Sequence, residues 1–215
     1  MPVDDEKERL RTVARARRRT AAEQVGSTAG QALKDHFLAA RAAMGVPSTP
    51  DEDWRAVAGY WPMETEMDPR PLLRHLHGRG FDCALPVVVG RGRALHFRRW
   101  HPQTVLEPAG FGLLELPRSA PRVTPQVVLA PLLCFDDRGV RLGHGAGYYD
   151  YTLAALRRAG SVLAVGIAFA DQQVDRVPDA DHDQRLDWIV TEKGAIQVTA
   201  DQPGGPTPVM NATPS

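Results

Sequence analysis

Several features that would define a class of protein are scarce or missing in this 215-residue sequence. Its two cysteines, Cys83 and Cys134, cannot form a disulfide framework and have no second metal ligand at zinc-finger spacing. No run approaches the roughly 20 apolar residues that a membrane helix needs. The basic segment 15–19 precedes polar residues instead of the apolar core of a signal peptide. We therefore expect buried structural thiols, no membrane partner and a cytoplasmic location.

Net charge is also missing, because 26 lysines and arginines balance 26 aspartates and glutamates. This balance argues against a generic polyanion binder, so no nucleic acid is expected as a partner. The hydrophobic fraction of 43% and the charged fraction of 24% are ordinary for a soluble globular protein. Glycine and proline, at 19 and 18 residues, are enriched but below the level of a disordered chain. The composition predicts a soluble, loop-rich α/β protein.

The N-terminal part of the chain is predicted to be helical. Residues 5–44 are rich in good helix formers, and Leu10, Val13 and Arg17 are spaced to share one helix face. Ser27 is a candidate N-cap for a second helix. The basic residues of this segment would, on composition alone, form a solvated helix face.

From residue 54 onwards, strand patterns and helix patterns alternate. We expect strands at 57–61, 81–89, 94–100, 127–130, 162–169 and 188–191, helices that begin near Asp68 and at Tyr148, and a hairpin over 132–142. The run 127–130 is the most apolar and is predicted to lie at the sheet centre. Residues 102–125 are predicted to be mostly loop, and residues 201–215 are expected to be a flexible C-terminal tail.

The sharpest motif reads Arg-Leu-Gly-His-Gly-Ala-Gly-Tyr-Tyr-Asp at residues 141–150, between the predicted hairpin and helix. Glycines at every second position let backbone amides approach a ligand, and amides before a helix N-terminus form a cradle for phosphate. The motif has neither Walker A nor Gly-x-Gly-x-x-Gly spacing. Glycine spacing alone fits a plain tight turn equally well. The flanking Arg141, Tyr148, Tyr149 and Asp150 favour the phosphate site.

At this motif the sequence resembles the 5-formyltetrahydrofolate cyclo-ligase family, whose pattern reads Phe-Asp-x-x-Gly-x-Arg-Leu-Gly-x-Gly-x-Gly-Tyr-Tyr-Asp. Further matches follow in order at Lys7-Glu8-Arg9-Leu10-Arg11, at Glu66-Met67, at 111–115 (Phe-Gly-Leu-Leu-Glu) and at His182-Asp183, so the resemblance covers about residues 6–195. It implies a three-layer α/β sandwich with a mainly parallel sheet and N-terminal helices packed beside it. One domain is expected over residues 1–200.

The resemblance also implies a reaction. It predicts an enzyme that uses ATP and Mg²⁺ to convert 5-formyltetrahydrofolate to 5,10-methenyltetrahydrofolate, releasing ADP and phosphate. Phosphoryl transfer depends mainly on positioning and charge neutralisation, which amides, basic side chains and a metal ion supply. We expect these small molecules as the partners, and a monomer. Two alternatives stay open: a family member that binds 5-formyltetrahydrofolate without turnover, and another ATP-using enzyme on the same scaffold.

The site residues of the family carry over to matching positions. The expected ATP site comprises Lys7, Arg11, Arg141, Leu142, Gly143, His144, Gly145, Ala146, Gly147, Tyr148 and Tyr149. The expected folate site comprises Trp61, Glu66, His144, Gly145, Ala146, Gly147 and Tyr148. Arg141 and Tyr148 are the expected catalytic residues, and Asp150 and Asp183 the expected Mg²⁺ ligands.

Several of these residues also have a structural interpretation. Lys7 and Arg11 are one helical turn apart and would otherwise belong to a solvated face. Trp61 is equally well a core aromatic, and Asp183 a loop or capping residue. Ala146 stands where relatives often have glycine, and its methyl group is expected to crowd a backbone that needs positive φ. The position of each side chain relative to the glycine loop, residues 143–147, distinguishes the two interpretations.

Overall fold

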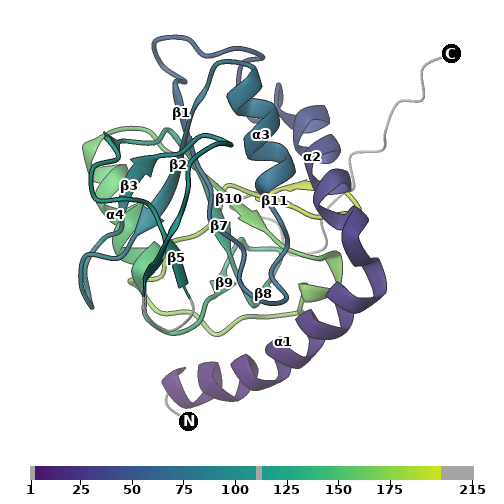
Figure 1. The fold of residues 1–215 in the computed structure, drawn as a ribbon. Helices are drawn as coiled ribbons and strands as arrows, with labels where there is room; N and C mark the ends of the chain where they lie inside the picture. The colour runs from purple at the N-terminus through teal and green to yellow at the C-terminus, as the bar shows by residue number, and fades with distance from the viewer. Residues whose placement is uncertain (1–2, 110–112, 200–215) are drawn as a thin grey trace, which may run out of the picture.

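The structure is a computed structural model that describes residues 3–109 and 113–199 (Figure 1). The expected tail over 201–215 lies outside these residues, as do Phe111 and Gly112 of the family pattern. In chain order the elements are α1 (Val3–Val25), η1 (Gly26–Thr28), α2 (Ala29–Ala40), β1 (Ala56–Ala58), α3 (Arg70–Gly78), β2 (Asp82–Val87), β3 (His96–Arg99), β4 (Glu107–Ala109), β5 (Leu113–Glu115), β6 (Arg122–Val123), β7 (Val127–Pro131), β8 (Cys134–Phe135), β9 (Arg141–Leu142), α4 (Tyr148–Ala159), β10 (Leu163–Ile167), η2 (Ala170–Gln172), β11 (Trp188–Val190) and β12 (Ala195–Gln197). None of the helices in this part of the chain is long and apolar enough to cross a membrane.

An eight-stranded sheet forms the centre of the molecule, in the order β12-β11-β10-β7-β1-β2-β3-β6. The inner strands from β11 to β2 are parallel, whereas β12, β3 and β6 pair antiparallel at the two edges. The prediction that 127–130 lies at the sheet centre is confirmed, because β7 pairs with both β10 and β1. Its side chains are buried on both faces, as its uniformly apolar sequence requires.

Helices cover both faces of the sheet, so the predicted three-layer sandwich is confirmed. Val127 and Leu129 of β7 face the layer of α2 and α3, where Leu33, Phe37, Leu72, Leu73 and Leu76 are buried. The alternate residues Val128 and Ala130 face α4, which buries Leu153. Because α3 connects β1 to β2 and α4 lies between β7 and β10, the chain leaves the two central strands toward opposite faces. This switch point is where ligands bind in open α/β sheets.

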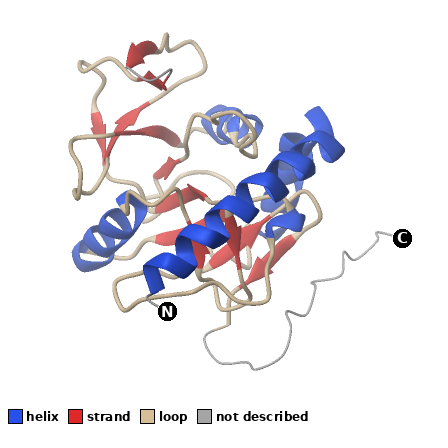
Figure 2. Ribbon diagram, turned by 90° about the horizontal axis from the view of Figure 1, so that it is seen from below, coloured by secondary structure: helices blue, strands red, loops and turns tan. Residues whose placement is uncertain are grey.

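Helix α1 lies across one end of the sandwich, as Figures 1 and 2 show from two directions. It packs against η2, which follows β10, and so occupies the carboxyl end of the parallel strands. Its buried face consists of Lys7, Ala14, Arg18 and Ala21. Leu10, Val13 and Arg17 lie on one helix, as their spacing predicts, but Val13 and Arg17 are exposed. Lys7 and Arg18 can occupy this buried face because each forms an ion pair with a carboxylate of the site described below.

The expectation that Ser27 caps the second helix is wrong, because Ser27 lies within η1 and α2 begins at Ala29 after Thr28 without a side-chain cap. Residues 102–125 are mostly outside regular structure, as predicted, and contain the short strands β4, β5 and β6. The thiols of Cys83 and Cys134 are buried as predicted, and burial raises the pKa of each to about 12.

The hairpin β8–β9, predicted from its turn sequence, carries the glycine loop. Its turn is held by Asp136, which is fully buried and accepts hydrogen bonds from the N–H groups of Val140 and Val177 at 3.1 and 3.0 Å. Arg138 forms an ion pair with the same carboxylate at 2.7 Å. These contacts join the hairpin to the segment that leads to Asp183, so both approach the carboxyl end of the sheet together.

Candidate active site

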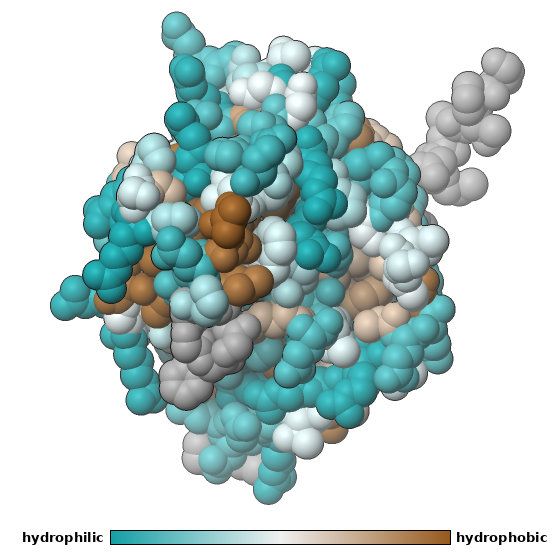
Figure 3. All heavy atoms as spheres, in the orientation of Figure 1, coloured by the Kyte–Doolittle hydropathy of each residue, from teal (hydrophilic) through white to brown (hydrophobic). Residues whose placement is uncertain are grey.

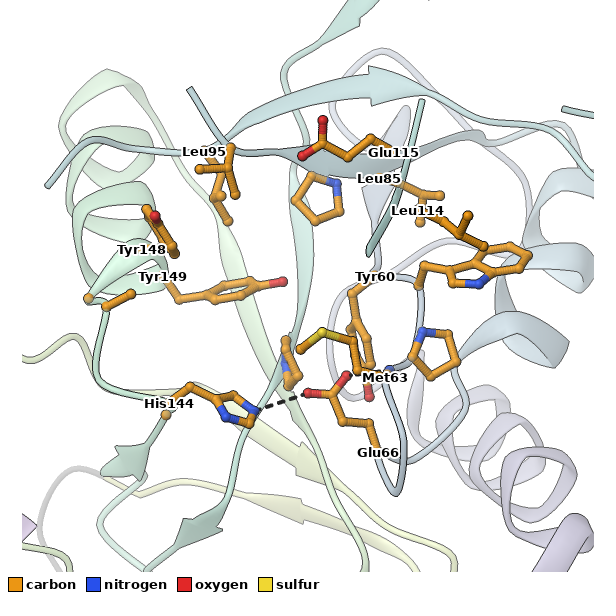
Figure 4. Close-up of a pocket in the computed structure, with 18 of the residues that line it drawn as sticks. Tyr60, Met63, Glu66, Leu85, Leu95, Leu114, Glu115, His144, Tyr148 and Tyr149 are labelled. Atoms are coloured by element: carbon orange, nitrogen blue, oxygen red, sulfur yellow. Dashed lines mark hydrogen bonds and ion pairs between the residues drawn. The ribbon is translucent and has the colours of Figure 1, made fainter. Parts of the chain in front are cut away.

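A cavity of about 670 Å³ lies at the switch point, and its size suits a small-molecule ligand (Figure 4). Its walls come from the segment that follows β1, from the end of β2 and from β5. The end of β7, the glycine loop and the start of α4 complete them. Ten of the residues predicted for the site line it, namely Trp61, Glu66, Arg141, Gly143, His144, Ala146, Gly147, Tyr148, Tyr149 and Asp150. The fold thus brings residues of the predicted ATP site and of the predicted folate site to one cavity.

The glycine loop connects β9 to α4 at one side of this cavity. Gly145 has φ +103°, and Gly147 has φ +68° as the N-cap of α4, so both adopt backbone that favours glycine. Ala146 does not: among the described residues Glu64 is the one non-glycine residue with positive φ. The expectation that the Ala146 methyl strains the loop is therefore wrong. The loop leaves the first N–H groups of α4 beside the cavity, as an anion cradle requires.

Helix α1 supplies two cations to this end of the site. Lys7 is buried, and its Nζ lies 2.5 Å from Oδ2 of Asp183. Arg11 Nε donates to the carbonyl oxygen of Gly143 at 3.1 Å, and a Cβ atom on Gly145 would lie 3.2 Å from Arg11 Cζ. A solvated face is thus the wrong interpretation of Lys7. Arg11 thus contacts the glycine loop and Lys7 contacts Asp183, and neither cation is part of the cavity lining. Leu142 is buried in the small apolar cluster that also contains Ala14 of α1.

The two aspartates predicted to bind Mg²⁺ lie close together. Asp150 Oδ1 accepts hydrogen bonds from Arg141 at 2.8 Å and from the backbone N–H of Gln184 at 3.0 Å. Since Gln184 directly follows Asp183, this contact brings the loop of Asp183 to the start of α4. Arg141 also donates to the carbonyl oxygen of Gln184. Each carboxylate is therefore neutralised by one buried cation, Arg141 or Lys7.

Glu66 is the predicted folate contact at the other end of the cavity, and it is almost completely buried. Its Oε2 accepts a hydrogen bond from the N–H of Met63 at 3.0 Å. Its Oε1 lies 3.3 Å from His144 Nε2 and 3.5 Å from Arg18 NH1. Figure 4 shows the imidazole and the carboxylate facing each other, with Tyr60 and Tyr149 reaching into the space beside them.

Arg18 is a site residue that sequence reasoning missed. It lies within a run of arginines, and nothing in its type distinguishes it from its neighbours. The one available signal is spacing: residues 7 and 18 are three helical turns apart and therefore lie on the same face of α1.

Two tyrosines, Tyr60 buried and Tyr149 half-buried, add neutral polar groups. Burial, with the nearby charge of Glu66, raises the pKa of both Tyr60 and Tyr149 well above the ordinary value. Their phenols therefore stay protonated at neutral pH. Tyr60 donates its O–H to the carbonyl oxygen of Met67 at 2.6 Å, which fixes the turn that presents Glu66.

The mouth and walls of the cavity are largely apolar. Trp61 is half-buried and lines the cavity, and the guanidinium of Arg70 lies 4.9 Å from the centre of its ring. Met63, Val88 and Leu114 line the cavity and are exposed large apolar side chains. Figure 3 shows apolar side chains gathered in a patch on this face of the molecule. Such walls suit a flat ring system.

Comparisons with known proteins agree with this geometry. Residues 3–192 match the sequence profile of the 5-formyltetrahydrofolate cyclo-ligase family. The cyclo-ligase of Mycolicibacterium smegmatis is 32% identical over 88% of this chain and 95% of its own length. The cyclo-ligase of Escherichia coli K12 is 33% identical over 63% of this chain and 76% of its own length.

Solved structures give the same result. The 5,10-methenyltetrahydrofolate synthetase of Aquifex aeolicus superposes with a TM-score of 0.71 at 26% identity, over 93% of this chain and 96% of that protein. The resemblance found in the sequence is thereby confirmed, as is the prediction of an enzyme. This chain belongs to the 5-formyltetrahydrofolate cyclo-ligase family.

Proposed function

We propose that the cavity binds ATP and 5-formyltetrahydrofolate side by side and joins their chemistry in one reaction. ATP phosphorylates the formyl oxygen on N5, the neighbouring N10 attacks the activated carbon and loses its proton, and phosphate leaves. The products are 5,10-methenyltetrahydrofolate, ADP and phosphate. The observation that carries the proposal is the convergence of the glycine loop, the buried cation Arg141 and Glu66 on one cavity.

The phosphate end of the proposed site is the glycine loop with Lys7, Arg11 and Arg141. Backbone N–H groups at the start of α4 favour an anion, and Gly145 and Gly147 allow it to approach the backbone. Arg141 lines the cavity and is held by Asp150, so its guanidinium is fixed before the ligand arrives. A fixed cation stabilises the charge of the transferring phosphoryl group without the cost of reorganisation. Tyr148, at the first position of α4, is proposed to contact the transferring group.

Mg²⁺ is proposed to bind beside Asp150 and Asp183. Within residues 3–109 and 113–199 there is no group of three or more His, Cys, Asp or Glu side chains placed to hold a metal ion. Two neighbouring carboxylates still fit Mg²⁺, which takes one or two carboxylates and completes its shell with water and phosphate oxygens. The ion would neutralise charge on the nucleotide phosphates. This arrangement implies that ATP and Mg²⁺ bind together.

The folate end is proposed to be formed by Glu66, Trp61 and the apolar wall. The pterin ring presents N–H donors, and a carboxylate is a strong acceptor for them. Trp61 offers a ring face at the cavity wall, and Leu85 and Leu95 cover the interior. The side chain of His144 reaches from the glycine loop to Glu66, where the two ligands would meet.

The test is a spectrophotometric assay of methenyl formation with purified protein, 5-formyltetrahydrofolate, ATP and Mg²⁺. We expect product only when all three are present. A folded protein that binds 5-formyltetrahydrofolate but forms no product would instead support the binding protein without turnover. Product formation that does not need ATP would overturn the proposal.

Three broader expectations are proposed with it. Residues 1–200 are taken as one catalytic domain, the active form as a monomer, and the cytoplasm as its location. Size-exclusion chromatography with light scattering, under assay conditions, tests the oligomeric state. A truncation after residue 200 that keeps full activity would support the domain boundary.

A further inference from the structure

Arg18 and Glu66 form a buried ion pair at the folate end of the cavity. The side chains of Arg18 and Glu66 are 5% and 3% exposed, so water screens neither charge. A buried ionised carboxylate needs a partner of opposite charge, because desolvation alone makes it unstable. A pterin ring supplies N–H donors but no formal positive charge. The countercharge of Glu66 must therefore come from the protein.

Arg18 is the buried cation that lies beside this carboxylate. Arg18 NH1 lies 3.5 Å from Glu66 Oε1, and Arg18 Nε donates to Thr65 Oγ1 at 3.2 Å. The guanidinium therefore touches two successive residues of the segment that carries the folate contact. His144 also faces Oε1, at 3.3 Å, but its side chain is 40% exposed and belongs to the glycine loop.

The geometry points to Arg18 as a positioning residue for 5-formyltetrahydrofolate. It neutralises Glu66 and fixes the direction of its carboxylate before the ligand binds. The free energy of ligand binding is therefore not reduced by burying a charge or by orienting the side chain. This inference rests on the proposed folate contact of Glu66. It adds a residue of α1 to the folate end, whereas Lys7 and Arg11 of the same helix serve the phosphate end.

This assignment makes a selective prediction. The substitution Arg18→Met keeps much of the aliphatic volume but removes the charge and the hydrogen-bond donors. We expect the KM for 5-formyltetrahydrofolate to rise at least about tenfold, the cost of one well-placed charged contact, while the KM for ATP changes less than about twofold. The matched control is Arg19→Met, which removes an exposed arginine from the next position of α1 and leaves both values unchanged.

A double-mutant cycle separates positioning from general destabilisation. In a Glu66→Gln background there is no carboxylate for Arg18 to neutralise, so Arg18→Met has little further effect on the folate KM. Arg18→Lys keeps the charge without the planar fork, and we expect it to recover part of the lost affinity. Equal losses in both backgrounds, or equal losses for folate and ATP, would overturn the inference.

If Arg18→Met does not fold, Thr65→Val tests the same contact from the other side. It removes the acceptor that orients Arg18 Nε and leaves both charges in place. We expect a smaller increase in the folate KM, about two- to fivefold, with the ATP KM unchanged. An unchanged folate KM in this variant argues against positioning. If the wild-type protein forms no methenyl product, the proposed function fails. If the wild type is active but the Arg18 variants raise the KM for folate and for ATP equally, this inference alone fails.

Discussion

Lys7 Nζ lies 2.5 Å from Asp183 Oδ2, although 176 residues separate the two along the chain. The same carboxylate oxygen accepts the N–H of Ala180 at 2.8 Å, so Asp183 is fixed by its own loop as well as by α1. This contact joins the first helix to the last loop of the site. It places a cation and a carboxylate at the edge of the glycine loop, where phosphate and Mg²⁺ are proposed to bind.

Loss of this pair should weaken nucleotide binding. In Lys7→Met the carboxylate of Asp183 remains largely buried without its cation, which costs about 1–3 kcal/mol of stability. The phosphates also lose a positive charge, so the affinity for ATP with Mg²⁺ falls. Calorimetry with ATP and separately with 5-formyltetrahydrofolate checks the result. The control is Lys193→Met, which removes a lysine whose side chain is 65% exposed. Unchanged ATP affinity would show that Lys7 serves the loop structure alone.

Asp150→Asn should remove activity while leaving the fold. The amide oxygen still accepts the N–H of Gln184, but the carboxylate charge that binds Mg²⁺ is gone. Mutating a residue that only supports a metal ligand typically lowers metal affinity by roughly 10–100-fold. Loss of the ligand itself should lower the apparent affinity for Mg²⁺ by more than that. The measurement is an activity titration with Mg²⁺, beside Asp175→Asn at an exposed position. Wild-type activity at limiting Mg²⁺ would contradict metal binding by Asp150.

Glu66→Gln should weaken folate binding far more than ATP binding. The neutral amide loses the charge that strengthens hydrogen bonds from pterin N–H groups and adds a donor of its own, which costs about 1–3 kcal/mol of binding. It also leaves Arg18 without its anion, so melting without ligand should be measured in parallel. Equal losses of affinity for both ligands would mean that Glu66 supports the structure instead.

The glycine loop can be tested by two changes one residue apart. Gly145→Val places a β-branched side chain at φ +103° and beside Arg11, so it blocks the close approach of phosphate and costs about 1–3 kcal/mol of stability. We expect the ATP-dependent shift in melting temperature to vanish. Ala146→Gly is the control and should leave that shift intact, because Ala146 does not have positive φ. A full ATP shift in Gly145→Val would place the phosphates elsewhere.

Gly139 should be necessary for stability because no other residue fits its close approach to the backbone of Leu186. It has φ +73°, and a Cβ atom there would lie 2.7 Å from the carbonyl oxygen of Leu186. We expect Gly139→Ala to lower the free energy of unfolding by about 3 kcal/mol or more. Gly26→Ala has similar φ and no atom within 4 Å of the added Cβ, so it should cost only about 1–2 kcal/mol. Chemical denaturation compares the two, and equal losses would show that the contact with Leu186 is unimportant.

The elements near the glycine loop could be predicted from the sequence because their signals are local. A turn sequence with Gly139 specified the hairpin β8–β9, and α4 begins at the predicted Tyr148. The apolar run that forms β7 has no polar face, which is possible only at the centre of a covered sheet. The order of family motifs along the chain likewise identified the family without structural information.

Tertiary structure decided which residues face the site. Spacing alone does not say which face of α1 is buried, and Lys7 and Arg18 are buried there because Asp183 and Glu66 neutralise them. Partners 176 and 48 residues away cannot be found from local pattern. The same holds for Ala146, whose φ depends on the path of the whole loop. The sequence by itself determined the elements and the family; which charges pair across the cavity was decided by folding, because pairing depends on distances in space.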